Sequence, residues 1–346
     1  MVPGSSLEVS MPIGLEHRSF GCTGEKVSII GLGGAALYKH SYEQGVATVK
    51  HALDLGVTYF DTSPAYGKAG ADGRWVERGK SQLIMGEGLD GTSKPHLLAT
   101  KLVSYTTLGG ANPMGYRTLE DCRLQLKHSL NALRRDKVDV LQGHDMEKAK
   151  AWVPNALNDD ELLDIDKEHD YENSAIIQAL REAKKQGLCS YIGLSFNQSV
   201  ALAHVFRRVK LDMCLSASQY SLLDRRSPRT VQPLVDEQGI AYVVGGIFRG
   251  LVTSYEASPF RLSLQGPLAQ TGGIFSDERL IKLAKTSGIS IAALTVRFLI
   301  ANSKLSTILV GASRPEEIEE SVLAAQAGPL PPDIHQTLEN LYVVDG

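Results

Sequence analysis

Three ionisable side chains stand at or near the ends of separate strand-like runs in this sequence. They are Asp61, Lys101 and His144, and Tyr66 follows Asp61 by five residues in a segment rich in turn-forming residues. If the runs are consecutive parallel strands, their ends lie along one rim and bring these groups together. Each also has a structural explanation: a loop cap for Asp61, a solvated charge for Lys101 and a satisfied core histidine for His144.

Together these side-chain types suit proton transfer at an oxygen atom. The pKa of an unperturbed tyrosine is about 10, and a lysine ammonium beside the ring favours the phenolate. A carboxylate next to that lysine holds it charged and oriented. Such a tyrosine gives a proton to a carbonyl oxygen or takes one from a hydroxyl, while a histidine orients the substrate oxygen.

The order of elements predicts the fold. Short strand-like runs alternate with amphipathic helical stretches, as in repeated βα units with a parallel sheet. The eight predicted strands are 26–34, 57–61, 96–102, 137–144, 189–195, 213–219, 241–246 and 306–312. Eight units favour a closed (β/α)₈ TIM barrel over an open doubly wound sheet, and in such a barrel active sites form at the carboxyl ends of strands. We expect an N-terminal tail over 1–14 and one domain over 15–346, opened by a β-hairpin over 14–28.

Helix signals agree with this alternation. Thr118 is a predicted N-cap with Asp121 three residues on, and apolar residues recur at helical spacing behind it. The stretches 43–56 and 174–187 each end in a glycine suited to a C-cap, Gly56 and Gly187.

Composition narrows the function classes. The 346 residues are 43% hydrophobic and 22% charged, with a net charge of -3, so no broad basic field favours nucleic acid. No apolar run reaches the roughly 18 to 20 residues of a membrane-spanning helix. The four cysteines are scattered without a C-x-x-C pair, which fits reduced thiols in a cytoplasmic protein rather than disulfides or a metal site. The first residues do not read as a secretory signal.

At this point the sequence resembles the aldo-keto reductases. The segments that carry the resemblance include GVTYFDTSPAYG, LLATK, VDVLQGHD, YIGLSFN and VGASRPEEIEES, and they follow the family's order along nearly the whole chain. Within the family, the sequence most resembles sugar-oxidising members such as L-galactose dehydrogenases and D-threo-aldose 1-dehydrogenases. The resemblance implies a catalytic tetrad of Asp61, Tyr66, Lys101 and His144, and a nicotinamide cofactor across the barrel mouth without a Rossmann domain.

The same resemblance implies which residues lie near that cofactor. Ser195, Asn197 and Gln219 match positions that hold the carboxamide, and Phe196 separates Ser195 from Asn197 where relatives have the pair adjacent. The remaining implied neighbours are Gly33, Gly34, Ala35, Ile247, Arg249, Gly250, Leu251, Gly311, Ser313, Arg314, Glu317, Glu320 and Ser321. A tight turn is the structural alternative for the two glycines at 33 and 34.

The segment after the last predicted strand bears on cofactor choice. Ser313 is a predicted N-cap there, with Glu316 completing a capping box. By this resemblance, NADP-selective members have a lysine and an arginine at the positions that correspond to Gly311 and Glu317 of this sequence. A carboxylate at 317 would repel a 2′-phosphate, which predicts NAD, whereas Arg314 nearby favours NADP. The glutamates of this segment also have a structural reading as partners of the helix dipole.

The expected function is therefore NAD-preferring oxidation of an aldose or similar polyhydroxy or cyclic alcohol. The alternatives are an NADPH-dependent aldehyde or ketone reductase and a non-catalytic, cofactor-sensing subunit. Two long loops, 68–79 and 146–173, emerge at the predicted rim. Tyr38, Trp75 and Trp152 are candidates for substrate contact, and loop anchoring is the alternative for both tryptophans. We expect a small-molecule carbonyl or sugar substrate; the sequence carries no signal for the oligomeric state.

Overall fold

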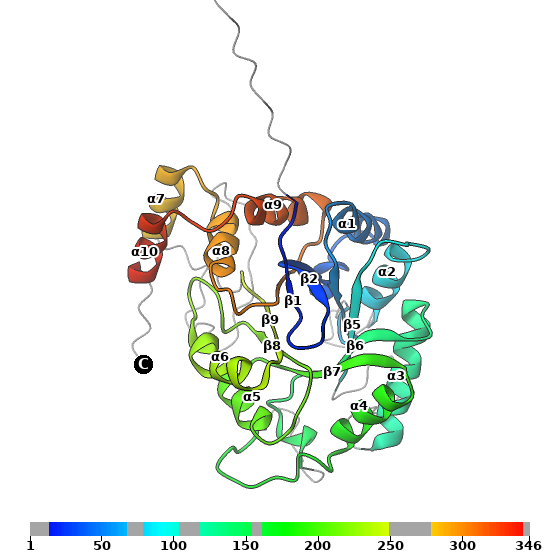
Figure 1. Cartoon of the computed structure of the whole chain (residues 1–346). Helices are drawn as coiled ribbons and strands as arrows, with labels where there is room; N and C mark the ends of the chain where they lie inside the picture. The colour runs from blue at the N-terminus through cyan, green and yellow to red at the C-terminus, as the bar shows by residue number, and fades with distance from the viewer. Residues whose placement is uncertain (1–13, 68–78, 104–117, 154–160, 249–277, 342–346) are drawn as a thin grey trace, which may run out of the picture.

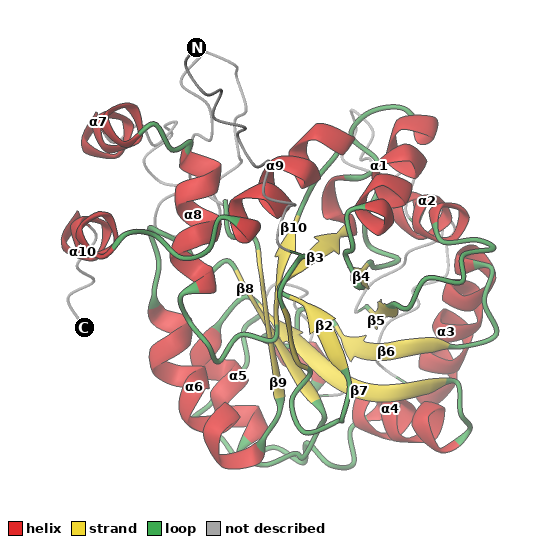
Figure 2. Ribbon diagram, turned by 45° about the horizontal axis from the view of Figure 1, so that its top comes forward, coloured by secondary structure: helices red, strands yellow, loops and turns green. Residues whose placement is uncertain are grey.

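Eight parallel strands close into a barrel in the order β10–β3–β4–β5–β6–β7–β8–β9 in the computed structural model of the chain (Figures 1 and 2). The structure describes residues 14–67, 79–103, 118–153, 161–248 and 278–341. The barrel strands are β3 (Ile30–Gly33), β4 (Tyr59–Asp61), β5 (Leu97–Leu102), β6 (Val138–Gly143), β7 (Cys189–Phe196), β8 (Met213–Ala217), β9 (Ala241–Gly245) and β10 (Thr307–Val310). The predicted (β/α)₈ barrel is confirmed.

The predicted N-terminal hairpin is also present and covers one end of the barrel (Figure 1). Strand β1 (His17–Ser19) pairs antiparallel with β2 (Lys26–Ser28). Between them lies Phe20, fully buried, with its ring centroid 5.5 Å from that of Tyr59 at the start of β4. The hairpin therefore closes the amino-terminal end of the barrel and leaves the other end for the site.

The first predicted strand was wrong as a single element, whereas the others differ from the structure by one or two residues at their ends. The run 26–34 was expected as one strand, but it divides into β2 and β3 at Ile29. The corner is held by reciprocal hydrogen bonds of 2.8 Å, from the Ser28 amide to the Thr58 hydroxyl oxygen and from the Thr58 amide to the Ser28 hydroxyl oxygen. Lys26 then pairs with the hairpin, whereas Ile30 pairs with β10 in the barrel.

Helices surround the barrel (Figure 2). They are α1 (Tyr42–Asp54), α2 (Lys80–Gly88), α3 (Leu119–Leu133), α4 (Ala175–Lys185), α5 (Ser199–Phe206), α6 (Arg226–Gln238), α7 (Glu278–Ser287), α8 (Ile291–Ile300), α9 (Pro315–Gln326) and α10 (Pro332–Leu341). The predicted cap at Thr118 is present, since its side chain accepts from the Asp121 amide. Gly56 and Gly187 follow α1 and α4 with φ values of 85° and 74°, as expected of residues that end a helix.

Helices α7 and α10 are additions outside the ring. The His335 ring of α10 stacks on Phe298 of α8 with centroids 4.7 Å apart, and Arg225 donates to the Glu339 carboxylate at 2.8 Å. These contacts tie the C-terminal helix to the barrel wall. Among the described segments, no single helix is long and apolar enough to cross a membrane, and only the pair α7 and α8, bent by 86°, passes that test, by length and composition alone.

Candidate active site

The barrel interior changes from apolar to polar along three neighbouring strands. Strand residues two positions apart share a face. The inner apolar layer includes one residue from each of β4, β5 and β6, namely Tyr59, Ala99 and Val140. Two positions further along each strand, towards the carboxyl end, come Asp61, Lys101 and Gln142. Alternation of the strand thus carries a buried apolar core directly into a polar cluster.

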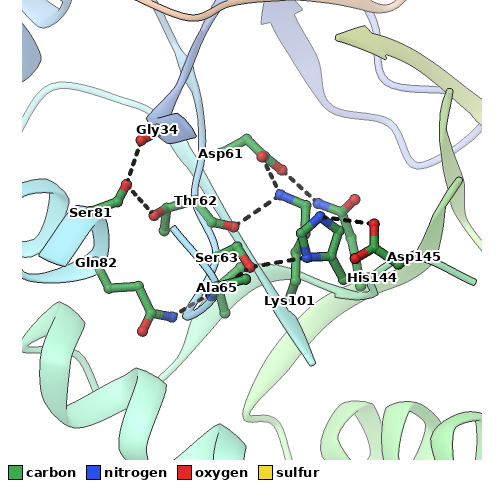
Figure 3. Close-up of polar contacts among 12 residues, drawn as sticks. Gly34, Asp61, Thr62, Ser63, Ala65, Ser81, Gln82, Lys101, His144 and Asp145 are labelled. Atoms are coloured by element: carbon green, nitrogen blue, oxygen red, sulfur yellow. Dashed lines mark hydrogen bonds and ion pairs between the residues drawn. The ribbon is translucent and has the colours of Figure 1, made fainter. Parts of the chain in front are cut away.

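Asp61 and Lys101 form a buried ion pair in that cluster (Figure 3). Lys101 Nζ donates to Asp61 Oδ1 and also to the carbonyl oxygen of Thr62 at 2.9 Å. Gln142 Nε2 donates to Asp61 Oδ2 at 2.8 Å, so both carboxylate oxygens have partners. The Lys101 side chain is 0% exposed and that of Asp61 2%. Burial lowers the pKa of Lys101, and the adjacent Asp61 opposes that effect.

Tyr66 lies beside this ion pair. Lys101 Nζ is 5.2 Å from the centroid of the Tyr66 ring, which meets the His144 ring edge-to-face at 5.6 Å. The loop that carries Tyr66 is held by hydrogen bonds from its amide to Ser63 O at 3.1 Å and from the Ser81 amide to Tyr66 O at 3.3 Å. The structure therefore brings all four residues of the predicted tetrad together.

His144 is fixed through its backbone and through its ring, whose contacts with Ser63 and Asp145 are drawn in Figure 3. Its amide donates to Leu102 O at 2.9 Å, and its Nδ1 lies 3.2 Å from Ser63 Oγ. On the other side of the ring, Nε2 lies 3.7 Å from Asp145 Oδ1. Burial lowers the pKa of His144, Asp145 opposes this, and the Lys101 charge lowers it further. The neutral imidazole, with one N–H donor, is therefore the favoured form near neutral pH.

The residues expected near a nicotinamide fall into three groups. The first surrounds Gly34, where a side chain would not fit because a Cβ would lie 2.4 Å from Ser81 Oγ. Ser81 Oγ in turn donates to Gly34 O and bonds Thr62 Oγ1, both at 2.8 Å. Packing alone thus accounts for this glycine. Gly33 is buried and Ala35 is exposed on a short 3₁₀ turn, Gly34–Ala36.

The second group lies at the ends of β7 and β8. Ser195 is buried, and Gln219 Oε1 accepts from the Ser199 amide at 2.5 Å, so this side chain also caps α5. That bond does not use the amide nitrogen of Gln219. A serine hydroxyl and an amide N–H₂ group are the donors and acceptors that a carboxamide needs, so these two residues fit it. Asn197 differs, because its side-chain nitrogen Nδ2 donates to two carboxylates, those of Asp145 and Glu147.

The third group opens α9, and here the predicted cap was wrong. The N-cap is Arg314, with Pro315 as the first helical residue, and Glu317 rather than Glu316 reaches back. Ser313 donates to Glu317 Oε2 from its amide at 2.7 Å and from its hydroxyl at 3.0 Å. Arg314 Nη2 donates to Glu317 Oε1 at 3.1 Å. Burial raises the pKa of Glu317, but these hydrogen bonds outweigh it and hold the pKa below its ordinary value.

The other residues predicted near the cofactor have varied surroundings. Gly311 is exposed and Ile247 is buried. Glu320 Oε1 accepts from the hydroxyl of Ser290, the N-cap of α8, at 2.6 Å. Ser321 Oγ donates to Glu317 O within α9 at 3.1 Å, so both side chains have structural partners. Residues Arg249, Gly250 and Leu251 lie outside the described part of the chain.

Of the predicted substrate contacts, Tyr38 is half-buried near the rim and Trp75 lies outside the described residues. Trp152 is only 5% exposed, donates from Nε1 to Met146 O at 2.7 Å, and meets the Tyr171 ring edge-to-face at 5.0 Å. These contacts match the alternative reading, in which the ring anchors its own loop, and leave little of its surface for a substrate.

Comparison with known proteins identifies the family of this chain. The family model described as the aldo/keto reductase family matches residues 29–343. The chain belongs to the aldo/keto reductase family. Members of this oxidoreductase family use nicotinamide cofactors and act on small carbonyl or sugar substrates. The resemblance seen in the sequence is therefore confirmed.

This aldo/keto reductase is similar to several characterised proteins. It is 27% identical to L-galactose dehydrogenase from Arabidopsis thaliana over 322 residues, which cover 90% of this chain and 88% of that protein. It is 21% identical over 296 residues to D-threo-aldose 1-dehydrogenase from a Pseudomonas species, covering 81% and 83%. The holo form of an aldo-keto reductase from Bacillus halodurans superposes with a TM-score of 0.72 at 23% identity, covering 95% and 96%, and supports the fold.

Three polar residues of the site were missed from the sequence. Gln142 has the plainest signal, because it lies two positions before His144 and so shares its face of the strand. Asp145 and Glu147 gave none, since their approach to Asn197 depends on the loop conformation after β6.

Proposed function

We propose that this aldo/keto reductase oxidises an aldose or a similar polyhydroxy or cyclic alcohol with NAD, and that Tyr66 exchanges the proton. The observation that carries the proposal is the meeting of Tyr66 with the Lys101 ammonium and the His144 ring at one rim. The Lys101 charge, 5.2 Å from the Tyr66 ring centroid, favours the phenolate. A phenolate is the base that an alcohol substrate requires.

The proton and the substrate oxygen are handled by separate groups. Asp61 holds Lys101 in place and is itself held by Gln142, so neither needs to move during turnover. The Tyr66 phenolate takes the hydroxyl proton, and a neutral His144 donates one hydrogen bond to the same oxygen. When bound, a nicotinamide would supply the acceptor for the hydride that leaves the carbon. In the reverse direction the Tyr66 phenol returns its proton to a carbonyl oxygen.

The cofactor assignment is supported by the segment that opens α9. Glu317 remains anionic there because Ser313 and Arg314 donate to both of its carboxylate oxygens. A carboxylate at this place repels a 2′-phosphate and neutralises Arg314, which would otherwise attract it. Ser195 and Gln219 would hold the carboxamide. The sugar substrate is supported by the names of the two dehydrogenases reported above.

Steady-state turnover of a panel of aldoses with NAD and with NADP tests the proposal, followed at the nicotinamide absorbance. We expect oxidation of at least one aldose, with kcat/KM higher for NAD by about tenfold or more, which corresponds to ~1.4 kcal/mol. A preference for NADP of that size would contradict the cofactor assignment and favour an NADPH-dependent reductase. Activity confined to simple aldehydes would contradict the substrate class.

A further inference from the structure

Asp145 has a backbone conformation that few residues other than glycine adopt. It follows His144 at the carboxyl end of β6 with a φ of 55°, in the left-handed region. Asparagine and aspartate enter this region more readily than other residues, but its use still has a free-energy cost of about 1 kcal/mol or more. The backbone turn aims the carboxylate back at the His144 ring, with Asp145 Oδ1 lying 3.7 Å from His144 Nε2 (Figure 3).

A built network holds that carboxylate from behind. Asn197 Nδ2 donates to Asp145 Oδ1 at 3.1 Å and to Glu147 Oε1 at 2.9 Å, and the Asn197 amide donates to Glu147 Oε2 at 3.0 Å. Glu147 is 5% exposed. Burial raises the pKa of Glu147, and the Asp145 charge raises it further. Asn197 is thus fixed at both ends, and the position of Asp145 is fixed with it.

The distance between Asp145 and His144 has a chemical meaning. At 3.7 Å the carboxylate oxygen Oδ1 of Asp145 is near Nε2 of His144 but beyond direct hydrogen-bond distance from it. The Asp145 side chain is 19% exposed and that of His144 12%, so each retains an accessible edge. His144 donates to the reacting oxygen in the proposed function, so a hydroxyl on the neighbouring carbon is the group that can donate to the Asp145 carboxylate, whereas a methylene there has no O–H to donate. The pair therefore matches a substrate with a hydroxyl beside its reacting carbon.

We infer that Asp145 accepts a hydrogen bond from the substrate hydroxyl on the carbon next to the one that is oxidised, and so selects polyhydroxylated substrates. This inference deepens the proposed function and rests on it. A hydrogen bond to a charged group contributes about 1.5–3 kcal/mol, which is roughly a 10-fold to 150-fold effect on kcat/KM. A substrate without that hydroxyl does not use the bond.

Reduction of lactaldehyde and of propanal with NADH tests this directly, because the two aldehydes differ by the hydroxyl next to the carbonyl. We expect the wild-type enzyme to prefer lactaldehyde. Asp145→Asn should lower kcat/KM for lactaldehyde roughly 10-fold to 150-fold while propanal changes by less than about threefold. Asp145→Gly removes the carboxylate and suits the left-handed backbone, so it gives the same answer if the asparagine variant folds poorly.

A matched control is Asp139→Asn, the same substitution near the amino end of β6, where Asp139 Oδ2 accepts from the Leu98 amide at 2.7 Å. We expect it to leave the ratio of the two kcat/KM values unchanged. An equal fall for both aldehydes in Asp145→Asn would overturn the inference and assign Asp145 to the positioning of His144. An unchanged ratio with both activities intact would also overturn it. No oxidation of any aldose by the wild-type enzyme would overturn the proposed function, whereas aldose oxidation without a preference for lactaldehyde over propanal would overturn the inference alone.

Discussion

The carboxylate of Asp61 and the ammonium of Lys101 are paired in the barrel interior, at the ends of adjacent strands and shielded from solvent. Gln142, from the next strand, donates to Asp61 Oδ2, the carboxylate oxygen to which Lys101 does not donate. The pairing allows two charges to remain in the barrel interior, where burial of an isolated charge would cost much free energy. It also fixes the ammonium beside the Tyr66 ring, so stability and chemistry depend on the same pair.

Removal of one partner should destabilise the protein strongly. Lys101→Met leaves the Asp61 carboxylate buried without its counter-charge, and we expect a loss of about 3–5 kcal/mol in the free energy of unfolding. The double variant Asp61→Asn with Lys101→Met carries no buried charge, so its loss should be smaller than the sum of the two single losses. Urea denaturation of all four proteins measures this coupling. Additive losses would contradict it.

The buried imidazole of His144 should make stability depend on pH. Burial lowers its pKa, so below about pH 6.5 the unfolded chain protonates this group while the folded chain does not. The unfolded state then binds more protons, and stability falls as the pH falls, by up to ~1.4 kcal/mol per pH unit from this group. His204, whose pKa burial also lowers, adds to the slope.

His144→Gln should flatten that slope below about pH 6.5, as measured by urea denaturation at several pH values. His40→Gln, on an exposed residue, is the matched control and should keep the wild-type slope. If the His144 variant lost stability with falling pH as steeply as the wild type, the buried neutral imidazole would be excluded as a source.

The carboxylate of Glu317 should set the cofactor preference. Glu317→Gln removes the charge that holds Arg314, which frees this guanidinium for a 2′-phosphate. We expect the ratio of kcat/KM for NADP to that for NAD to rise about tenfold, equivalent to ~1.4 kcal/mol. Glu316→Gln removes the same charge from the neighbouring exposed position and should change the ratio little. Equal changes in the two variants would assign the effect to general electrostatics.

Trp152 should act on stability rather than on substrate choice. Trp152→Phe loses the hydrogen bond to Met146 O, which leaves a carbonyl without its partner, at a cost of about 1–2 kcal/mol. The ratio of kcat/KM between two aldoses should stay the same. Denaturation and kinetics on one preparation measure both quantities. A changed ratio with unchanged stability would place the ring in the substrate pocket.

Much of this site was predictable from the sequence because its charged members stand at strand ends. Asp61, Lys101 and His144 each close a recognisable run, and a barrel brings such ends to one rim. Gln142 was missed because a glutamine within an apolar run has no motif, although its spacing from His144 places it on the same face. The position of the Asp145 carboxylate depends on a left-handed backbone turn, which an aspartate can adopt but which its presence in the sequence does not predict.

The fold was predictable for a related reason, and its errors were local. The alternation of strand-like and helical runs predicts eight βα units, and this pattern survives small boundary errors. The division of 26–34 at Ile29 depends on which partner each half meets, and partners are distant in the sequence. The cap of α9 moved from Ser313 to Arg314 because Glu317, a residue inside the helix, takes both hydrogen-bond donors of Ser313.

The most direct test of the account is the turnover of Tyr66→Phe, which removes the phenolic oxygen and keeps the ring. We expect kcat for aldose oxidation to fall by about 10²–10⁴, the usual contribution of a general acid or base, with NAD binding measured by fluorescence titration almost unchanged. Near wild-type kcat in this variant would contradict the assignment of proton transfer to Tyr66, and with it the role given to the buried pair beside it.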